Sequence, residues 1–431
     1  MKRYSEYKDS GVKWIGEIPG HWKKNKIMRL FTHIGSGTTP KGDQYYTDES
    51  NGIPWINSGD LNYGFLTKCN KYITEKALND ISTLKKYPIN TLMIAMYGAS
   101  IGKYAISHIE GCTNQACCAL YGIKDELNLT YASYLMGPCK QKWIEESFGG
   151  TQPNISAEKI KQTWLPLPPL PEQEAIVTYL DSKVAKIDEY ISIAEKKIAA
   201  LEELKQTIIA EAVTRGIHKD VPMKDSGVKW IGMIPEHWKM KSLRSYVKLY
   251  SEKNHPEKQL LSVTREMGVI VRNTESKEEN HNFIPDDLSG YKLVRKGDFV
   301  INKMKSWQGS YGVSKYEGIV SPAYYVCKLE FPYNDFFSIA IRCKSYVPFF
   351  TQYSKGIRVD QWDLSPIALK NIPFMEPPIA EQQEIVTYIE AKVANINQLC
   401  QAERSQIEKL KEYKQRLISD VVTGKVKVTN D

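Results

Sequence analysis

The sequence predicts a mixed α/β (α+β) chain in which two similar globular domains are joined by two long helices that pair as an antiparallel coiled coil. Three observations predict this fold. A 16-residue segment occurs twice, a long heptad pattern occurs twice, and a strand-rich region lies between them in each copy. The chain is therefore predicted to be a tandem repeat with pseudo-twofold symmetry.

The repeat begins with a short segment rich in Trp, Pro and Gly. Residues 8–23 read KDSGVKWIGEIPGHWK and residues 224–239 read KDSGVKWIGMIPEHWK, with 14 identities in 16 at an offset of 216. Chance does not produce this agreement. We name the two stretches the HW segments, after their shared His-Trp pair, and expect each to begin one copy of the unit.

The middle regions share a weaker pattern. At an offset of 207 six residues pair with an identical residue in the second copy: Ile94, Gly102, Tyr104, Glu110, Gly111 and Ala116. The drop from 216 to 207 places nine net deletions in the second copy before residue 301, where we expect surface loops. Runs such as 91–96, 299–302 and 324–329 are rich in β-branched and aromatic residues, which predicts a curved sheet in each domain.

Divergent loops on one scaffold favour domains that bind different ligands. Neutral drift is the alternative, but drift would also have eroded the HW segments and the helices.

Each copy ends with a helix that carries a coiled-coil seam. Prolines stand before both helices, where they stop the preceding domain. Ten of eleven positions are apolar in the first seam, which is Val177, Leu180, Val184, Ile187, Ile191, Ala194, Ile198, Leu201, Lys205, Ile208 and Ala212. Nine of eleven are apolar in the second, which is Val386, Ile389, Val393, Ile396, Cys400, Glu403, Ile407, Leu410, Lys414, Leu417 and Val421. The simplest partner for each helix is the other one. Lys205 and Lys414 occupy the same seam position in the two copies. Each lysine either extends its charged end from the seam into solvent or fixes the register of the helix pair.

These patterns give the domain boundaries. We expect the first leading segment at residues 1–23, the first globular domain at 24–167 and the central helix at 168–217. A linker with the second HW segment follows at 218–239, then the second globular domain at 240–376, the C-terminal helix at 377–424 and a tail at 425–431.

Composition excludes several classes of protein. Hydrophobic residues make up 42% and charged residues 25% of the chain, which is ordinary globular composition. No apolar stretch approaches the ~20 residues of a membrane span, and no signal-peptide core is present, so we expect a cytoplasmic protein. The eight cysteines form no C-x-x-C pair and are expected to be buried thiols.

Net charge indicates the class of ligand. Residues 24–163 hold 15 Lys and Arg against 12 Asp and Glu, and residues 240–370 hold 20 against 14, whereas the helices are near neutral. Basic domains with Tyr, Trp, Asn and Gln in their loops suit duplex DNA. A membrane surface is disfavoured, because no basic amphipathic helix accompanies the charge.

Catalytic motifs are missing. The sequence has no phosphate loop of the G-x-x-x-x-G-K-[ST] type, no G-x-G-x-x-G loop, no H-E-x-x-H and no Asn followed by Pro. We therefore expect no catalytic residue, no metal ligand and no cofactor in this chain. Two alternatives stay open: a nuclease or methyltransferase whose motif is degenerate, and a coiled-coil scaffold whose globular domains bind protein.

Several of these motifs together resemble one family. They are the two HW segments, PEQEAIV at 171–177, AEQQEIV at 380–386, VTRG at 213–216, VTGKVKV at 422–428 and the second-domain runs LSVTREMGVIVR, YKLVRKGDFVINKMKSWQGSYGVS and GIVSPAYYV. Over essentially the whole length, the chain resembles the DNA-specificity subunit of type I restriction-modification systems.

The resemblance implies that two target-recognition domains each read half of a bipartite DNA site, and that the paired helices act as a ruler. It also implies that helices and flanking segments dock two adenine-N6 methyltransferase subunits, which ATP-dependent restriction subunits join. S-adenosylmethionine, ATP and Mg²⁺ would then belong to those partners.

Candidate DNA-binding residues follow from side-chain chemistry, because amide, hydroxyl and cationic groups suit base edges and phosphates. In the first domain they are Ser36, Thr38, Lys41, Asn57, Ser58, Asp60, Tyr97, Ser100 and Lys103. In the second domain they are Arg265, Arg272, Lys303, Lys305, Trp307, Gln308, Arg358 and Gln361. Turn formation is the alternative role for the Asn and Ser residues. Trp307 and Trp362 are equally compatible with core positions.

Overall fold

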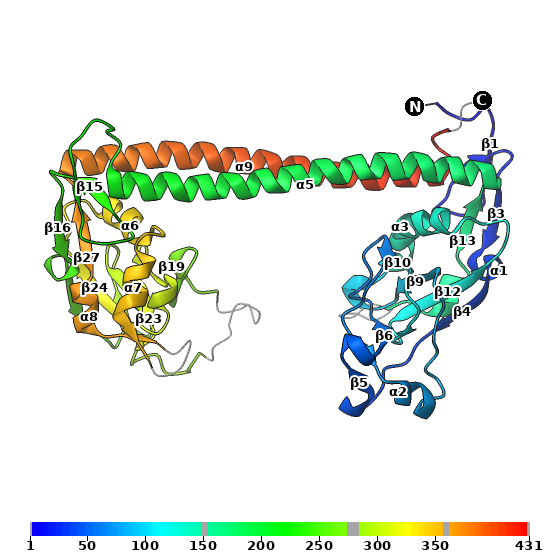
Figure 1. Cartoon of the computed structure of the whole chain (residues 1–431), viewed down its shortest axis with the longest axis horizontal. Coiled ribbons are helices and arrows are strands. Elements are labelled where there is room, and N and C mark those ends of the chain that lie inside the picture. The colour runs from blue at the N-terminus through cyan, green and yellow to red at the C-terminus, as the bar shows by residue number, and fades with distance from the viewer. Residues whose placement is uncertain (1, 148–153, 274–283, 357–361, 429–431) are drawn as a thin grey trace. The chain divides into compact units, whose positions relative to one another are not determined.

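A computed structural model describes residues 2–147, 154–273, 284–356 and 362–428 (Figure 1). The chain divides into two compact units. Unit 1 comprises Met1–Ala194 and Ser405–Asp431, and unit 2 comprises Glu195–Arg404. Each unit therefore contains one globular domain and a part of each long helix.

Unit 1 contains the first copy of the repeat. Its strands are β1 (Tyr7–Asp9), β2 (Glu17–Pro19), β3 (Lys23–Lys26), β4 (Phe31–Ser36), β5 (Tyr46–Thr47), β6 (Ile53–Ile56), β7 (Phe65–Leu66), β8 (Tyr72–Ile73), β9 (Thr91–Ala95), β10 (Tyr104–Ser107), β11 (Cys112–Thr113), β12 (Cys117–Ile123) and β13 (Trp164–Leu167). Its helices are α1 (Ile27–Leu30), α2 (Glu75–Asp80), α3 (Leu129–Glu145), α4 (Ala157–Lys161), the 3-10 turns η1 (Asp43–Tyr45), η2 (Glu49–Asn51) and η3 (Gly98–Ser100), and the first part of α5 (Leu170–Arg215).

The main sheet of unit 1 has the strand order β4-β12-β9-β10-β7, and a second sheet has the order β11-β6-β8-β5. Strand β9 is central and all five of its residues are buried. Asn128 caps the N-terminus of helix α3, because its side chain accepts a hydrogen bond from the Tyr131 backbone N–H. It packs the sheet against α5 through a core that includes Tyr131, Leu135 and Leu180.

Unit 2 contains the second copy. Its strands are β14 (Met223–Asp225), β15 (Met233–Pro235), β16 (Lys239–Ser242), β17 (Val247–Tyr250), β18 (Leu261–Thr264), β19 (Gly268–Val271), β20 (Lys292–Val294), β21 (Phe299–Asn302), β22 (Tyr311–Val313), β23 (Gly318–Val320), β24 (Tyr324–Leu329), β25 (Ser354–Lys355), β26 (Asp363–Leu364) and β27 (Pro373–Glu376). Its helices are α6 (Asn334–Arg342), α7 (Val347–Tyr353), α8 (Pro366–Asn371), the 3-10 turns η4 (Leu243–Ser245) and η5 (Ser306–Gln308), and the first part of α9 (Ile379–Val422).

The two domains share one scaffold, as predicted. The order β17-β24-β21-β22 in unit 2 repeats β4-β12-β9-β10 in unit 1. Tyr104 pairs with Ile94, and Tyr311 pairs with Ile301, which reproduces the 207-residue offset in the strand register. The sheet register thus confirms an alignment that rested on six scattered identities.

The copies differ mainly between β4 and β9. The strand registers place eight of the nine net deletions there, in residues 37–90 of the first copy and 252–297 of the second. The expectation of loops was too simple, because the first copy has α2 and three strands of the four-stranded sheet, β5, β6 and β8, in this stretch. The second copy has β18, β19 and β20 in the described part of the same stretch.

The long helices pair as predicted. In unit 2, Lys197 Nζ contacts Glu403 and Lys205 Nζ donates to Asn397 Oδ1 at 3.3 Å, so the two helices run antiparallel. In unit 1, Lys414 Nζ donates to Asp188 Oδ1 at 2.6 Å. Every predicted seam residue is buried or half-buried.

The two seam lysines occupy equivalent positions and have equivalent partners. Asn397 corresponds to Asp188 at the 209-residue offset of the helices, so the two lysine contacts repeat one another. A specific partner across the seam favours the register-setting interpretation over snorkelling into solvent.

In unit 1 the HW segment packs against the ends of both helices. The buried Glu172 carboxylate accepts hydrogen bonds from Trp22 Nε1 at 3.0 Å and contacts His21 Nε2 at 2.8 Å. Gly424, just beyond α9, has φ +77°, and a Cβ there would lie 2.4 Å from Pro19. Only glycine fits this close approach, which explains the VTG motif after the helix.

Unit 2 repeats the arrangement. Glu381 Oε2 accepts from Trp238 Nε1 at 3.1 Å and contacts His237 Nε2 at 2.8 Å. Gly216, after α5, has φ +75° and lies close to Glu381. Each HW segment thus joins the start of one long helix to the end of the other.

The eight cysteines are buried free thiols, as predicted. Within the described ranges, no helix is long and apolar enough to cross a membrane. The same residues hold no group of three or more His, Cys, Asp or Glu side chains placed to bind a metal ion.

Candidate nucleic-acid interface

In unit 1, strand ends gather along one edge of the main sheet. Strand β4 ends at Ser36, which pairs with Cys118, and β9 ends at Ala95, which pairs with Cys117 at the start of β12. Strand β10 begins at the same edge with Tyr104. The loops that leave these strands therefore lie together.

Hydrogen bonds connect these loops. Thr38 N–H donates to Thr113 O at 3.0 Å, Asn114 Nδ2 donates to Asn57 Oδ1 at 3.0 Å, and Met96 N–H donates to Ala116 O at 2.8 Å. The structure thus brings together the predicted residues Ser36, Thr38, Asn57, Ser58, Tyr97 and Ser100. Lys103 is half-buried beside them, and Lys41 is exposed in the loop after Thr38.

The Asp60 carboxylate accepts hydrogen bonds from residues of its own loop. One carboxylate oxygen accepts from Asn57 N–H at 2.8 Å, and the other accepts from Asn70 N–H at 3.2 Å and Asn70 Nδ2 at 2.6 Å. These bonds favour turn formation over base contact for Asp60.

The same sheet edge in both copies carries a seven-residue loop, which we name tip loop 1 (residues 96–102) and tip loop 2 (residues 303–309). Ala95 N–H donates to Lys103 O at 2.8 Å, and Asn302 N–H donates to Ser310 O at 3.0 Å, so equivalent bonds close the two loops. Both end on a glycine with positive φ, Gly102 or Gly309. Their sequences, MYGASIG and KMKSWQG, share only that glycine.

Tip loop 2 holds four predicted residues: Lys303, Lys305, Trp307 and Gln308. Lys305 is exposed, whereas Lys303 is half-buried and pairs with Asp363 at 3.5 Å. Trp307 lies 5.2 Å from Trp362 between ring centroids, and both rings are half-buried. Trp307 Nε1 is buried without a hydrogen-bond partner in the described structure.

The two predicted arginines that the structure describes lie in or beside the β18–β19 hairpin. Arg265 is exposed in the turn, next to Gly309 of tip loop 2. Arg272 follows β19 and lies near Tyr324. Burial raises the pKa of Tyr324, and the positive charge of Arg272 opposes part of that rise. Arg358 and Gln361 lie outside the described residues.

Sequence reasoning missed Arg342 of α6. Its guanidinium donates to the backbone carbonyls of Tyr311 at 2.6 Å, Glu266 at 2.8 Å and Arg265 at 3.1 Å. It therefore fastens the β18–β19 turn to β22. No local motif marks this residue, because its partners are backbone atoms far away in sequence.

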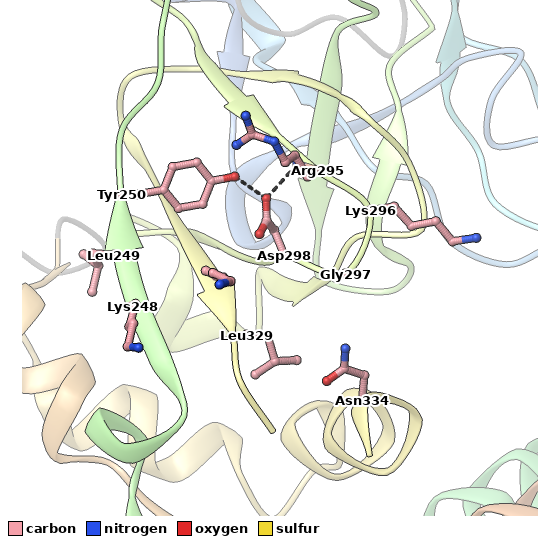
Figure 2. Close-up of a pocket in the computed structure, with 10 residues that line it drawn as sticks. Lys248, Leu249, Tyr250, Arg295, Lys296, Gly297, Asp298, Leu329 and Asn334 are labelled. Atoms are coloured by element: carbon pink, nitrogen blue, oxygen red, sulfur yellow. Dashed lines mark hydrogen bonds between the residues drawn. The ribbon is translucent and has the colours of Figure 1, made fainter. Parts of the chain in front are cut away.

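A pocket of about 530 Å³ lies at the opposite end of β21 from tip loop 2 (Figure 2). Burial raises the pKa of Asp298 there, although the Tyr250 hydroxyl and the Arg295 backbone N–H donate to its carboxylate. Lys248 pairs with Glu330 at 2.6 Å, and Arg295 pairs with Glu252 at 2.7 Å. These ion pairs neutralise much of the positive charge, so the pocket is a poor candidate for binding DNA.

Comparison with known proteins shows which family the chain resembles. The family model for the type I restriction modification DNA specificity domain matches residues 19–203. The provisionally named type I restriction enzyme MjaX specificity subunit of Methanocaldococcus jannaschii is 24% identical, over 98% of this chain and 98% of that protein. The EcoR124I/EcoR124II specificity subunit of Escherichia coli is 26% identical, over 42% of this chain and 44% of that protein.

A solved structure supports the fold. One chain in a structure that concerns complex assembly and conformational transition of the type I R-M system matches with a TM-score of 0.66 and 14% identity. The match covers 94% of this chain and 98% of the other. The family model covers most of the first copy, and the second copy repeats the HW segment, strand order and long helix of the first. The chain is therefore similar over its whole length to the DNA-specificity subunits of type I restriction-modification systems, and its residues 19–203 match their DNA specificity domain.

Proposed function

We propose that each globular domain reads one half of a bipartite duplex DNA site through the sheet edge that carries its tip loop. One observation carries the proposal: the two tip loops have equal length and equivalent closing hydrogen bonds but different side chains. Equal scaffolds with different contact groups are expected of domains that read different base sequences. The positive net charge of both domains suits the phosphate backbone.

The helix pair supplies the second part of the proposal, which is that it sets the unread spacer and docks two adenine-N6 methyltransferase subunits. Its outer surface carries large apolar side chains. In unit 1, Tyr190 is 63% exposed and Tyr413 is 47% exposed. In unit 2, Leu204 is 48% exposed and Leu399 is 43% exposed.

These four residues share one heptad position, because each stands directly before a seam residue. In an antiparallel pair, residues at this position flank the seam on the same side. Tyr190 and Leu399 are also equivalent under the repeat, as are Leu204 and Tyr413, so each unit presents an apolar pair of the same kind. Two repeated apolar patches suit two copies of one partner protein.

Lysine substitution tests the docking surface. Tyr190→Lys with Tyr413→Lys should reduce the methyltransferase that co-purifies with the chain, because each lysine places a charge in the interface. The control is Ser182→Lys, an exposed position on the face of α5 away from the seam. Equal co-purification of the double variant and the control would remove this surface from the proposal.

In this proposal S-adenosylmethionine serves the methyltransferase subunits, and ATP and Mg²⁺ serve restriction subunits, while this chain contributes no catalytic group. The experiment is co-expression with the methyltransferase subunit of its own host, followed by methylation-sensitive sequencing of host DNA. A bipartite motif with one fixed unread gap is expected. A continuous motif, or methylation that does not depend on this chain, would contradict the proposal.

A further inference from the structure

An exposed apolar side chain stands at the same position in both tip loops. Tyr97 is 44% exposed in tip loop 1, and Met304 is 51% exposed in tip loop 2. The two positions are equivalent, because each is the second residue after the closing bond of its loop. One exposed apolar residue on a surface is ordinary, but repetition at one position in loops that share only a glycine is not explained by the scaffold.

Unit 2 carries a second exposed thioether, on the β18–β19 turn that contacts tip loop 2. Met267 is 68% exposed at the tip of the β18–β19 turn, and the same turn carries Arg265 beside Gly309 of tip loop 2. The three hydrogen bonds from Arg342 hold this turn in place. Two methionines are therefore presented on supported backbone, next to the cationic side chains of Arg265 and Lys305.

This combination suits a DNA groove better than a protein surface. Cations beside an apolar tip place phosphates around it, and the apolar groups then face the base edges. In the major groove the apolar feature is the C5-methyl group of thymine, which distinguishes an A·T pair from the other pairs. Methionine and tyrosine can both cover a methyl group.

We propose that Met304, supported by Met267, contacts a thymine C5-methyl group in the second half-site, and that Tyr97 does the same in the first. This inference rests on the proposed function, since it names the specificity-determining residues of the same surface. It assigns base reading to apolar groups at the tips and leaves phosphate contacts to the neighbouring lysine and arginine residues.

Replacement of thymine by deoxyuridine tests the proposal, because uracil lacks only the methyl group. The complex with its methyltransferase is titrated with duplexes in which each thymine of the mapped site is replaced singly. Loss of one buried methyl contact should weaken wild-type binding about fourfold at one thymine in each half-site. Met304→Ala should bind the thymine and uracil duplexes equally at the second half-site and keep the fourfold difference at the first. Tyr97→Ala should show the converse.

Two further variants control for folding. Met304→Leu should retain the thymine preference, and Met233→Ala, a 44% exposed methionine in β15, should leave both preferences unchanged. A half-site without thymine, or a thymine preference that Met304→Ala leaves intact, would overturn the proposal. In both cases wild-type binding to the mapped site would still support the proposed function, whereas failure of the wild-type complex to bind that site would contradict the function itself.

Discussion

Lys305 and Lys296 form a matched pair of exposed lysines at opposite ends of β21. Lys305 lies in tip loop 2, and Lys296 lines the pocket at the start of the strand. If tip loop 2 meets the DNA backbone, Lys305→Ala removes one phosphate contact and Lys296→Ala removes none. Log affinity falls as log salt rises, and each phosphate contact adds about 0.9 to the steepness of that fall. Lys305→Ala should therefore make the slope shallower by about 0.9.

The expected effect is large enough to measure. Between about 0.1 M and 0.4 M salt, a slope difference of about 0.9 changes the ratio of wild-type to variant affinity roughly 3.5-fold. Lys303 pairs with Asp363 at 3.5 Å, so it must leave a carboxylate to reach a phosphate. If it does so, the Lys303→Ala, Lys305→Ala double variant should make the slope shallower by about 1.8.

The assay is fluorescence anisotropy of a labelled duplex, titrated with the complex of this chain and its methyltransferase over a salt series. Lys296→Ala should keep the wild-type slope. An unchanged slope for Lys305→Ala, or an equal reduction for Lys296→Ala, would refute the assignment of tip loop 2 to the DNA surface.

Two further predictions concern the helices. Helix α5 has 46 residues, or about 69 Å of continuous helix. One heptad inserted at matching points in α5 and α9 keeps the seam and adds about 10.5 Å, so methylome mapping should find an unread gap longer by about two to three base pairs with both half-sites unchanged. An active complex with the original gap would exclude the ruler. Glu381→Ala leaves Trp238 Nε1 buried without its acceptor, which should cost about 1–3 kcal/mol and lower the thermal midpoint of unfolding. A midpoint no lower than that of Glu384→Ala, an exposed control on the same helix, would show that the network does not stabilise unit 2.

The scaffold was largely predictable from sequence because it is repeated. The HW segments, the seams and the 207-residue offset each appear as matched residues, and strand register and seam burial confirm them. The strands β5, β6 and β8 of the four-stranded sheet, within residues 37–90, were not predictable in this way, because the second copy has no matching sequence there.

The candidate site was predictable only in part. Polar loop residues such as Asn57 and Lys305 could be selected by side-chain chemistry, but their partners are set by tertiary contacts. Asp60 accepts a hydrogen bond from Asn70, and Lys303 forms an ion pair with Asp363. Neither contact follows from the local sequence. The sequence alone could have marked Met304 as a candidate, since it aligns with Tyr97 at the 207-residue offset. It was left out because the candidates were chosen for polar side chains.

Independent reading by the two domains is the central claim, and a domain exchange tests it most directly. Residues 240–370 would be replaced by the same segment of a relative with a different target, and the chimaera co-expressed with its methyltransferase for methylome mapping. We predict a motif in which only one half-site changes, while the other half-site and the unread gap stay as in the wild type. A change in both half-sites, or in neither, would contradict independent reading.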